Sequence, residues 1–290
     1  MRIGYPCINR RIGCTANSTF RLNSYSKERV RLAVSNNLDC LFKILKWNSE
    51  NDLRFFRISS DIVPFASHPV MDVRWTHEFK KELKLVGHLV RQENMRISMH
   101  PDQFVLLNAL DKGIVQRSIA ELRYHAEVLD AMGIEDAAIQ IHVGGMYGNK
   151  AGAMDRFINT YRRLPANVKK RLAIENDERL YSLADCLAIH ERTKIPVIFD
   201  SFHNELNGRM PLKEAMNKAS ATWGRMPLMM DYSSQEKGKR PGTHAEHIDN
   251  GHFRKFLKEA KGDFDLMLEI KDKEKSAVQA LRIAKEMGWL

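Results

Sequence analysis

The sequence predicts a single (β/α)8 barrel, also called a TIM barrel, and three observations lead to this fold class. Eight short apolar or β-rich runs recur along the chain, and longer segments with helical periodicity separate them. A length of 290 residues is ordinary for an α/β barrel that forms one domain. Six of the eight runs carry a histidine or a carboxylate near their ends. We therefore expect one α/β domain over residues 1–290.

The eight runs have the composition of strands that are buried on both faces. Each is short and rich in Ile, Val, Leu, Phe or Met, which is typical of a parallel sheet covered by helices. We expect strands over Arg2–Pro6, Leu53–Ser59, Arg96–His100, Ala137–Gly144, Leu172–Asp177, Pro196–Phe202, Leu228–Ser234 and Asp265–Lys271.

Between these runs, apolar residues recur every three or four positions, which indicates amphipathic helices. Gly133 and Gly288 follow two of the helical segments, as glycines do at helix C-termini. Eight alternations fit a closed barrel better than an open doubly wound sheet, which would show fewer repeats and a Gly-rich first turn. We expect helices over Lys27–Asn48, Thr76–Arg91, Ile114–Met132, Ala153–Arg163, Ser182–Arg192, Leu212–Ala219, Phe253–Ala260 and Lys275–Met287.

The composition excludes several classes of protein. Hydrophobic residues make up 43% of the chain, which is enough for a core and argues against a disordered or fibrous protein. No apolar run reaches the roughly 18 residues of a membrane span, so we expect a soluble, cytoplasmic protein. Cys7, Cys14, Cys40 and Cys186 are too sparse for a disulfide framework and show no CxxC pairing, which favours a reducing compartment.

The charge balance favours a polyanionic partner. The formal net charge is +10, and Lys and Arg that neutralise phosphates release condensed counterions. The alternative is a solvated basic face that serves solubility alone.

Polar residues near the ends of six predicted strands form a candidate metal site. Parallel strands of a barrel end at one face, so these side chains converge there. A lone histidine on a strand is more often a satisfied core residue, but carboxylates packed together repel one another unless cations lie between them. The alternative is a set of structural ion pairs, but few Lys or Arg lie at these strand ends to serve as partners. The candidates are His100, His142, Glu175, Asp200, Asp231 and Glu269.

Three further histidines in neighbouring loops could complete this site, namely His68, His203 and His244. Imidazole and carboxylate ligands without cysteine suit Mn²⁺ or Zn²⁺, with Mg²⁺ and Co²⁺ as alternatives, and several carboxylates favour two or three bridged ions. Such a cluster activates water and holds both the attacking and the leaving oxygen of a phosphodiester. The residues therefore favour hydrolysis of a phosphate backbone.

Two loops add groups that suit nucleic acid. Lys237, Lys239 and Arg240 precede His244 and would place positive charge beside the metal site, unless they only form a solvated loop. Gln103 and Phe104 follow the third strand, and an amide beside an aromatic ring can wedge into a base stack. Core packing is the alternative for this dipeptide.

The motifs resemble those of UV damage endonucleases, which are relatives of the trinuclear-metal abasic-site endonucleases. The resemblance implies a (β/α)8 barrel that binds damaged duplex DNA. It implies hydrolysis of the phosphodiester immediately 5′ to a pyrimidine dimer or (6-4) photoproduct, leaving 3′-hydroxyl and 5′-phosphate ends. The matching segments, which cover almost the whole chain, are GYPCIN, FRISSDIVPFASHP, SMHPDQF, ELRYHAEVL, IHVGGMYG, LAIENDERL, FDSFHNELN, YSSQEKGKRPGTHAEH and LEIKDKE.

The resemblance also implies roles for individual residues, with manganese as the usual metal. Gln103 and Phe104 match the pair that probes the distorted dinucleotide, although relatives can carry Tyr at the position of Phe104. Tyr5 and Asn9 match residues near the lesion pocket. The positions that match metal-site residues are His68, His100, His142, Glu175, Asp200, His203, His244 and Glu269. We expect Glu175 to bridge two ions, with His100, His142, Asp200 and Glu269 in the catalytic set.

Strand seven departs from the pattern of some relatives, which read Lys-x-His with a carboxylated lysine and a histidine ligand. The aligned positions here are Met229 and Asp231. A methionine cannot be carboxylated, whereas Asp231 can replace imidazole as a hard oxygen ligand.

Three alternatives stay open at this point. An abasic-site endonuclease would use the same cluster without a strong preference for photoproducts. A metal-dependent sugar isomerase would share the barrel but would need neither the charge of +10 nor the Gln103–Phe104 wedge. A non-catalytic DNA-binding barrel would bind lesions without cleaving them. Nothing in the sequence indicates an obligate interface, so we expect a monomer.

Overall fold

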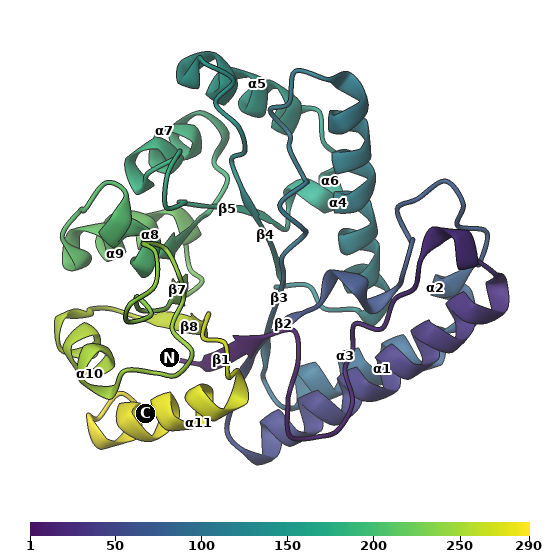
Figure 1. Ribbon diagram of the computed structural model, residues 1–290, viewed down its shortest axis with the longest axis horizontal. Coiled ribbons are helices and arrows are strands. Elements are labelled where there is room, and N and C mark those ends of the chain that lie inside the picture. Colours follow the sequence, from purple (N-terminus) through teal and green to yellow (C-terminus); the bar gives the residue numbers. More distant parts are fainter.

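Eight parallel strands form a closed ring in the computed structural model, which describes residues 1–290 (Figure 1). Each strand pairs with the next, and β8 closes the ring on β1 through the pairs Ile3–Leu266 and Gly4–Met267. The predicted TIM barrel is confirmed, and all eight predicted strands are present with slightly different ends. The strands are β1 Ile3–Pro6, β2 Phe55–Ile58, β3 Arg96–Met99, β4 Ala138–His142, β5 Leu172–Glu175, β6 Val197–Asp200, β7 Leu228–Tyr232 and β8 Phe264–Leu268.

Helices surround the ring of strands on its outside (Figure 1). They are α1 Lys27–Glu50, α2 Trp75–Glu78, α3 Lys80–Gln92, α4 Lys112–Met132, α5 Lys150–Arg162, α6 Ala166–Lys169, α7 Leu183–Thr193, α8 Ser201–Leu206, α9 Leu212–Ser220, α10 Asn250–Glu259 and α11 Glu274–Glu286. Three short 3₁₀ turns cover Leu22–Ser24, Ser60–Ile62 and Ala221–Trp223.

The helices differ from the prediction in two respects. The single helix expected over Thr76–Arg91 is divided into α2 and α3, because Phe79 has φ −105° and ψ 25°, outside the helical region. The prediction also omitted α6 and α8, which are four and six residues long. Segments of one or two turns are too short for helical periodicity to stand out in a sequence.

Local chemistry explains several element boundaries. The Ser26 hydroxyl accepts a hydrogen bond from the Arg29 N–H and caps the start of α1. Gly133, with φ 71°, ends α4 in the left-handed conformation that glycine adopts without strain. Gly4 permits the close approach of β1 to β2, because a Cβ atom there would lie 1.8 Å from the Phe55 carbonyl oxygen.

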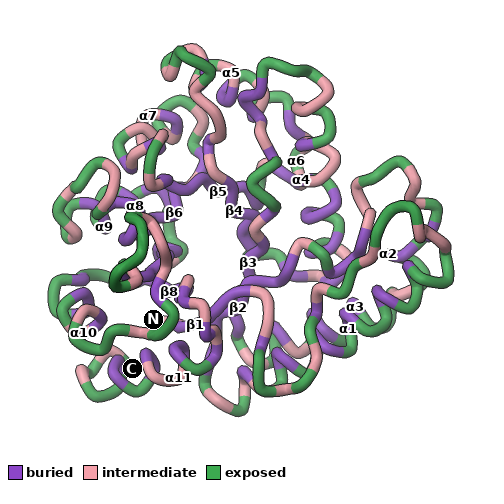
Figure 2. Tube along the Cα trace, in the orientation of Figure 1, coloured by how far each residue is buried: buried purple, intermediate pink, exposed green.

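The strands are the most buried part of the molecule, and the outer faces of the helices are the most exposed (Figure 2). Every residue of the strands is buried except His142, which is partly exposed. This burial on both faces explains why the strands have continuous rather than alternating apolar patterns. No helix has both the length and the apolar character that crossing a bilayer requires.

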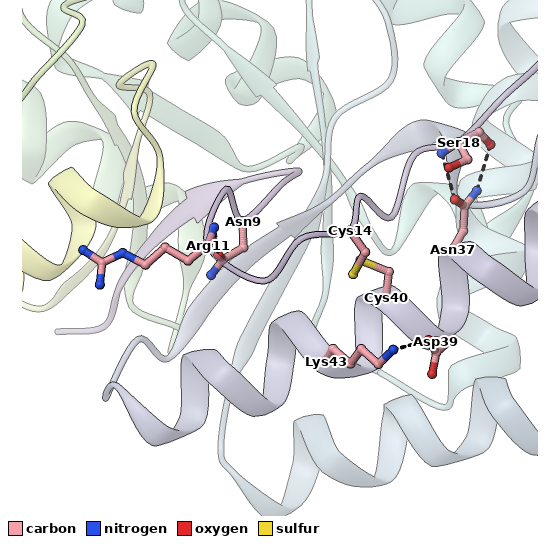
Figure 3. The surroundings of a disulfide bond; sticks show 8 residues. All are labelled: Asn9, Arg11, Cys14, Ser18, Asn37, Asp39, Cys40 and Lys43. Atoms are coloured by element: carbon pink, nitrogen blue, oxygen red, sulfur yellow. Dashed lines mark hydrogen bonds and ion pairs between the residues drawn. A yellow bond between two sulfur atoms is a disulfide. The ribbon is translucent and has the colours of Figure 1, made fainter.

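A disulfide joins Cys14, in the segment after β1, to Cys40 on α1 (Figure 3). The sequence argued against a disulfide framework and did not predict this single bond. The Cα atoms of the two cysteines lie 6.0 Å apart, although 26 positions separate them in the sequence. Nearby, the Asn37 side chain accepts from the Ser18 N–H and donates to its carbonyl. The pairing depends on how this segment folds back on α1, which cysteine spacing does not reveal.

Candidate metal centre at the barrel mouth

The carboxyl-terminal ends of the strands, called here the barrel mouth, bring four of the predicted ligands together around Glu175. This residue ends β5 and is 1% exposed. Its Oε2 atom lies 3.5 Å from His100 Nε2 and 3.7 Å from His142 Nε2. Its Oε1 atom lies 3.4 Å from His203 Nδ1. Each Glu175 oxygen therefore faces different imidazoles.

Two groups of potential ligand atoms share Glu175. His100, His142 and Glu175 form one group, and Glu175, Asp200 and His203 form the other; within each group the ligand atoms lie within 4.8 Å of one another. A carboxylate common to both groups could bridge two ions, as the sequence predicts for Glu175.

The start of α8 positions two of these ligands. Asp200 ends β6 and caps α8, because its Oδ1 atom accepts from the His203 N–H at 2.7 Å. Asn176, one residue after Glu175, fixes the end of β6 by exchanging hydrogen bonds with the Asp200 backbone through its side-chain amide. Its carbonyl also lies 3.0 Å from His203 Nδ1. The other Asp200 oxygen, Oδ2, is buried and has no hydrogen-bond partner.

Backbone carbonyls orient the imidazoles. His100 Nδ1 lies 2.9 Å from the Pro101 carbonyl, and His244 Nδ1 lies 2.8 Å from the Glu269 carbonyl. A neutral imidazole that donates from Nδ1 leaves the lone pair of Nε2 free for a metal. His142 and His203 lie between these rings, and successive ring centroids are 5.4 to 6.0 Å apart from His100 to His244. The four histidines thus line one arc of the mouth.

Asp231 and Glu269 are engaged differently from the other carboxylates. The sequence predicts both as metal ligands, whereas in the structure both Asp231 oxygens accept hydrogen bonds from Arg57 Nη2, at 2.9 and 2.8 Å. Arg57 Nη1 also donates to Glu269 Oε1. The expectation that few basic residues lie close enough to pair with these carboxylates is wrong here, because Arg57 reaches them from within β2, across the barrel.

Burial and neighbouring charges shift the pKa values of the central groups in different directions. Burial alone would raise the pKa of Glu175, but His142, His100 and His203 outweigh it and hold that pKa well below its usual range. Burial raises the pKa of Asp200 well above its usual range, although His203 opposes the shift. Burial lowers the pKa of His203, but the negative charges of Asp200 and Glu175 outweigh burial and raise this pKa to about 11. Asp200 and Glu175 therefore favour a positive charge at the position of His203.

A pocket of about 390 Å³ opens beside the first ligand group, with His100, His142 and Gln103 in its wall. Glu178 and Arg179, which follow β5, line its other side. A second pocket of about 410 Å³ lies next to it and is lined by His68 and Phe104. Phe104 is 73% exposed, so core packing is not its role. His68 belongs to neither ligand group and is exposed beside the Phe104 pocket.

Tyr5 and Asn9 lie in the interior rather than on an open surface. The Tyr5 hydroxyl donates to Asn48 Oδ1 at 2.5 Å and accepts from Asn9 Nδ2 at 2.8 Å. Tyr5 is 0% exposed and Asn9 is 1% exposed. Contact of these residues with a lesion therefore stays a prediction.

The basic loop after β7 adjoins the candidate metal centre. Lys237, Lys239 and Arg240 are exposed, and none of them forms a salt bridge. Gln235 and His244 form a β-bridge across the base of this loop. The loop therefore presents three unpaired cations next to the candidate ligand His244.

Sequence reasoning missed two groups that organise the mouth, Arg57 and Gln140. Gln140 on β4 donates to Glu175 Oε2 and to Asp231 Oδ2, each at 2.5 Å. The only available signal was a polar residue inside an otherwise apolar strand, in FFRI and in AIQIH. A buried polar residue in such a strand needs a partner inside the barrel.

Comparison with known proteins shows which family the chain resembles. Residues 1–288 match the family UV-endonuclease UvdE. A UV DNA damage endonuclease of Clostridium perfringens is 37% identical over 296 residues, covering 99% of this chain and 72% of that protein. One from Bacillus thuringiensis is 34% identical, covering 97% of this chain and 94% of its own length. The crystal structure of SacUVDE matches with a TM-score of 0.97 and 46% identity over 100% of both chains.

More distant structures share the fold alone. Endonuclease IV from Thermus thermophilus matches with a TM-score of 0.60 at 17% identity, over 85% of this chain and 93% of its own. A D-psicose 3-epimerase matches with a TM-score of 0.58 at 11% identity, over 86% of this chain and 94% of its own. The match over residues 1–288 and the similarity to full-length relatives place this chain in the UV damage endonuclease family, whose members are DNA repair nucleases.

Proposed function

We propose that this chain hydrolyses the phosphodiester immediately 5′ to UV photoproducts in duplex DNA, namely cyclobutane pyrimidine dimers and (6-4) photoproducts. The reaction depends on two or three divalent ions, Mn²⁺ in preference to Zn²⁺, Mg²⁺ or Co²⁺. Residues 1–290 act as one endonuclease domain and as a monomer. The observation that carries the proposal is the position of Glu175, whose two oxygens face two separate groups of ligands at the mouth of a barrel.

The residues present fit divalent ions. Both ligand groups contain imidazole nitrogens and carboxylate oxygens and no sulfur, which suits manganese. The buried Asp200 Oδ2 atom lacks a hydrogen-bond donor, and a buried carboxylate oxygen without a partner is costly. A cation between Asp200, Glu175 and His203 would remove this cost.

The proposed reaction adds water across the bond between phosphorus and the 3′ oxygen. The water oxygen bonds to phosphorus, the P–O3′ bond breaks and a proton passes to O3′, which gives the 3′-hydroxyl and 5′-phosphate ends. Divalent ions at this site would lower the pKa of water and stabilise charge on the departing oxygen. Glu175, Asp200 and the imidazoles would hold the ions, while Lys237, Lys239 and Arg240 would hold backbone phosphates without reading sequence.

Recognition of the lesion depends on how easily the DNA unstacks there. Phe104 extends from the loop after β3 and is exposed, and Gln103 lines the pocket next to His100. An aromatic ring and an amide in this position enter the helix most readily where stacking is already weakened. Base specificity should therefore be low, and the preference should follow the deformability of the lesion site.

The substitution Glu175→Gln tests the proposal, because it keeps the shape of the side chain and removes its charge. We expect incision of UV-irradiated duplex to fall by at least about 100-fold and bound manganese to decrease, since even indirect partners of a metal are worth 10- to 100-fold. Glu93→Gln is the matched control, because Glu93 pairs with Arg54 away from the mouth. Near wild-type incision with unchanged metal content in Glu175→Gln would reject the assignment.

A second assay separates this function from the alternatives. Dimer-containing and abasic duplexes are incubated at matched concentrations, and the ends of the products are analysed. Preferential incision 5′ to the dimer supports the proposal, whereas preferential incision at the abasic site would favour an abasic-site endonuclease. Affinity for DNA that falls steeply with salt would further distinguish a nuclease from a sugar isomerase.

A further inference from the structure

Arg57 is a buried cation that the proposed metal-dependent reaction does not use. It lies on β2, is 3% exposed and points across the barrel to β7 and to the end of β8. Its Nη2 atom donates to both oxygens of Asp231, and its Nη1 atom donates to Glu269 Oε1. The guanidinium therefore lies between two carboxylates of the same mouth that contains the Glu175 ligand groups.

Too few ligand atoms are free between Asp231 and Glu269 to bind an ion. A third ion would draw on Asp231, Glu269 and His244, because the remaining ligands already belong to the two groups around Glu175. Arg57 engages both oxygens of Asp231 and one oxygen of Glu269. Only Glu269 Oε2 and His244 Nε2 have no hydrogen-bond partner there, whereas a catalytic zinc site generally uses about three protein ligands.

Gln140 fixes this arrangement. Its carbonyl oxygen accepts from Arg57 Nη2 at 2.8 Å, and its amide nitrogen donates to Glu175 and to Asp231. Both amide hydrogens and the acceptor of Gln140 are therefore used inside the barrel. The same side chain connects Arg57 to the carboxylate that both ligand groups share.

The charge of the mouth points in the same direction. Glu175, Asp200, Asp231 and Glu269 carry four negative charges when ionised. Two divalent ions together with Arg57 would exceed them by one positive charge, which one phosphodiester of the substrate neutralises. A third divalent ion beside Arg57 would leave a large positive excess, and like charges at such short range repel strongly in a buried site.

We propose that the Arg57 guanidinium takes the position of a third divalent ion, so that this chain binds two ions at saturation. The inference rests on the proposed metal-dependent incision and fixes the number of ions that it uses. Arg57 acts as a positioning residue: it compensates Asp231 and Glu269 and holds Glu175 through Gln140.

The test is the number of manganese ions bound per chain after equilibrium dialysis, measured by elemental analysis. We expect two ions in the wild type and three in Arg57→Met, where Asp231 and Glu269 become free to bind a cation. Arg96→Met is the matched control and should keep two ions, because Arg96 is also a buried arginine paired with an aspartate, Asp265, but lies at the opposite end of the barrel. Three ions in the wild type, or two in Arg57→Met, would overturn the inference while leaving metal-dependent incision intact. A wild type that binds no manganese would overturn the proposed function as well.

A second measurement needs no variant and therefore does not depend on how Arg57→Met folds. Crystals of the wild type are soaked in manganese, and the ions are located by anomalous scattering. We expect two peaks, both next to Glu175, with the guanidinium between Asp231 and Glu269. A peak between Asp231 and Glu269 would contradict the inference.

Discussion

The two ends of the barrel each contain a buried arginine–aspartate pair, but they differ in whether all nearby carboxylate oxygens accept hydrogen bonds. At the amino-terminal ends of the strands, called here the barrel floor, Asp265 accepts from Arg96 at 2.9 Å and from the side chain and backbone of Arg2 at 3.0 and 2.6 Å. Both of its oxygens are therefore engaged. At the mouth, Arg57 pairs with Asp231, while Asp200 Oδ2 nearby accepts no hydrogen bond and has only His203 Nδ1, at 3.5 Å, as an ion-pair neighbour.

This difference separates stability from function. A carboxylate that protein donors fully satisfy has no capacity left for an ion and contributes to folding. A buried carboxylate oxygen without a donor costs stability and is retained where a ligand completes it. The chain connections agree with this division: only Glu93, Asn94 and Met95 separate α3 from β3 at the floor, whereas a segment of 17 residues separates β7 from α10 at the mouth.

The largest expected effect is a loss of folding stability when the ion pair at the barrel floor is broken. Asp265→Asn removes the charge that compensates Arg96 and Arg2, which leaves the buried Arg96 guanidinium uncompensated. We expect the free energy of unfolding to fall by about 3–5 kcal/mol, as for other broken buried ion pairs. Denaturant unfolding measures this loss. Incision per folded molecule should stay near the wild-type value, and a folded but inactive variant would contradict the division between floor and mouth.

The next effect concerns the segment that the disulfide ties beside the mouth. Cys14→Ser removes the bond to Cys40, and cross-links of this span contribute about 3 kcal/mol in the chain-entropy description. We expect a loss of that size in unfolding by denaturant. Reduced wild type should match the variant, and the variant itself should not respond to reductant. Equal stability of the oxidised and reduced wild type would show that the bond adds nothing.

A smaller effect depends on pH. His125 on α4 is buried between Ser60 and the Glu121 carbonyl, and burial lowers its pKa to about 4. In the unfolded chain its pKa is about 6.5, so the unfolded state binds the proton first and folding loses stability as pH falls below about 6.5. This one group should cost about 2 kcal/mol between pH 7 and pH 5.

Comparison with His125→Gln isolates this contribution, because all other titrating groups are retained. The wild type should lose more stability than the variant between pH 7 and pH 5 in urea unfolding. Identical pH dependence of the two proteins would show that His125 is not buried in its neutral form.

The sequence was sufficient for the barrel and for most of the candidate ligands. All eight strands were predicted because burial on both faces produces continuous apolar runs, and His100, Glu175 and Asp200 were found because strand ends meet at one face. These inferences use only local patterns and the direction of parallel strands.

What the sequence could not provide are contacts between distant strands. Arg57 and Asp231 are 174 positions apart, and only the closed barrel shows that they pair. The Cys14–Cys40 bond likewise depends on a segment that folds back on α1. Polar residues within apolar strands, such as Arg57 and Gln140, indicate that a partner exists but do not identify it.

The smallest effect on stability, and the sharpest test of the mouth, is expected for Phe104→Ala. Because the ring is 73% exposed, the free energy of unfolding should change by less than about 0.5 kcal/mol. Affinity for dimer-containing duplex should fall by about 10-fold, since stacking of one base on an aromatic side chain is worth about 1–3 kcal/mol. Phe104→Tyr keeps the ring and should retain the affinity. A loss in Phe104→Ala that is equal for damaged and undamaged duplex would show that Phe104 contacts DNA without probing the lesion.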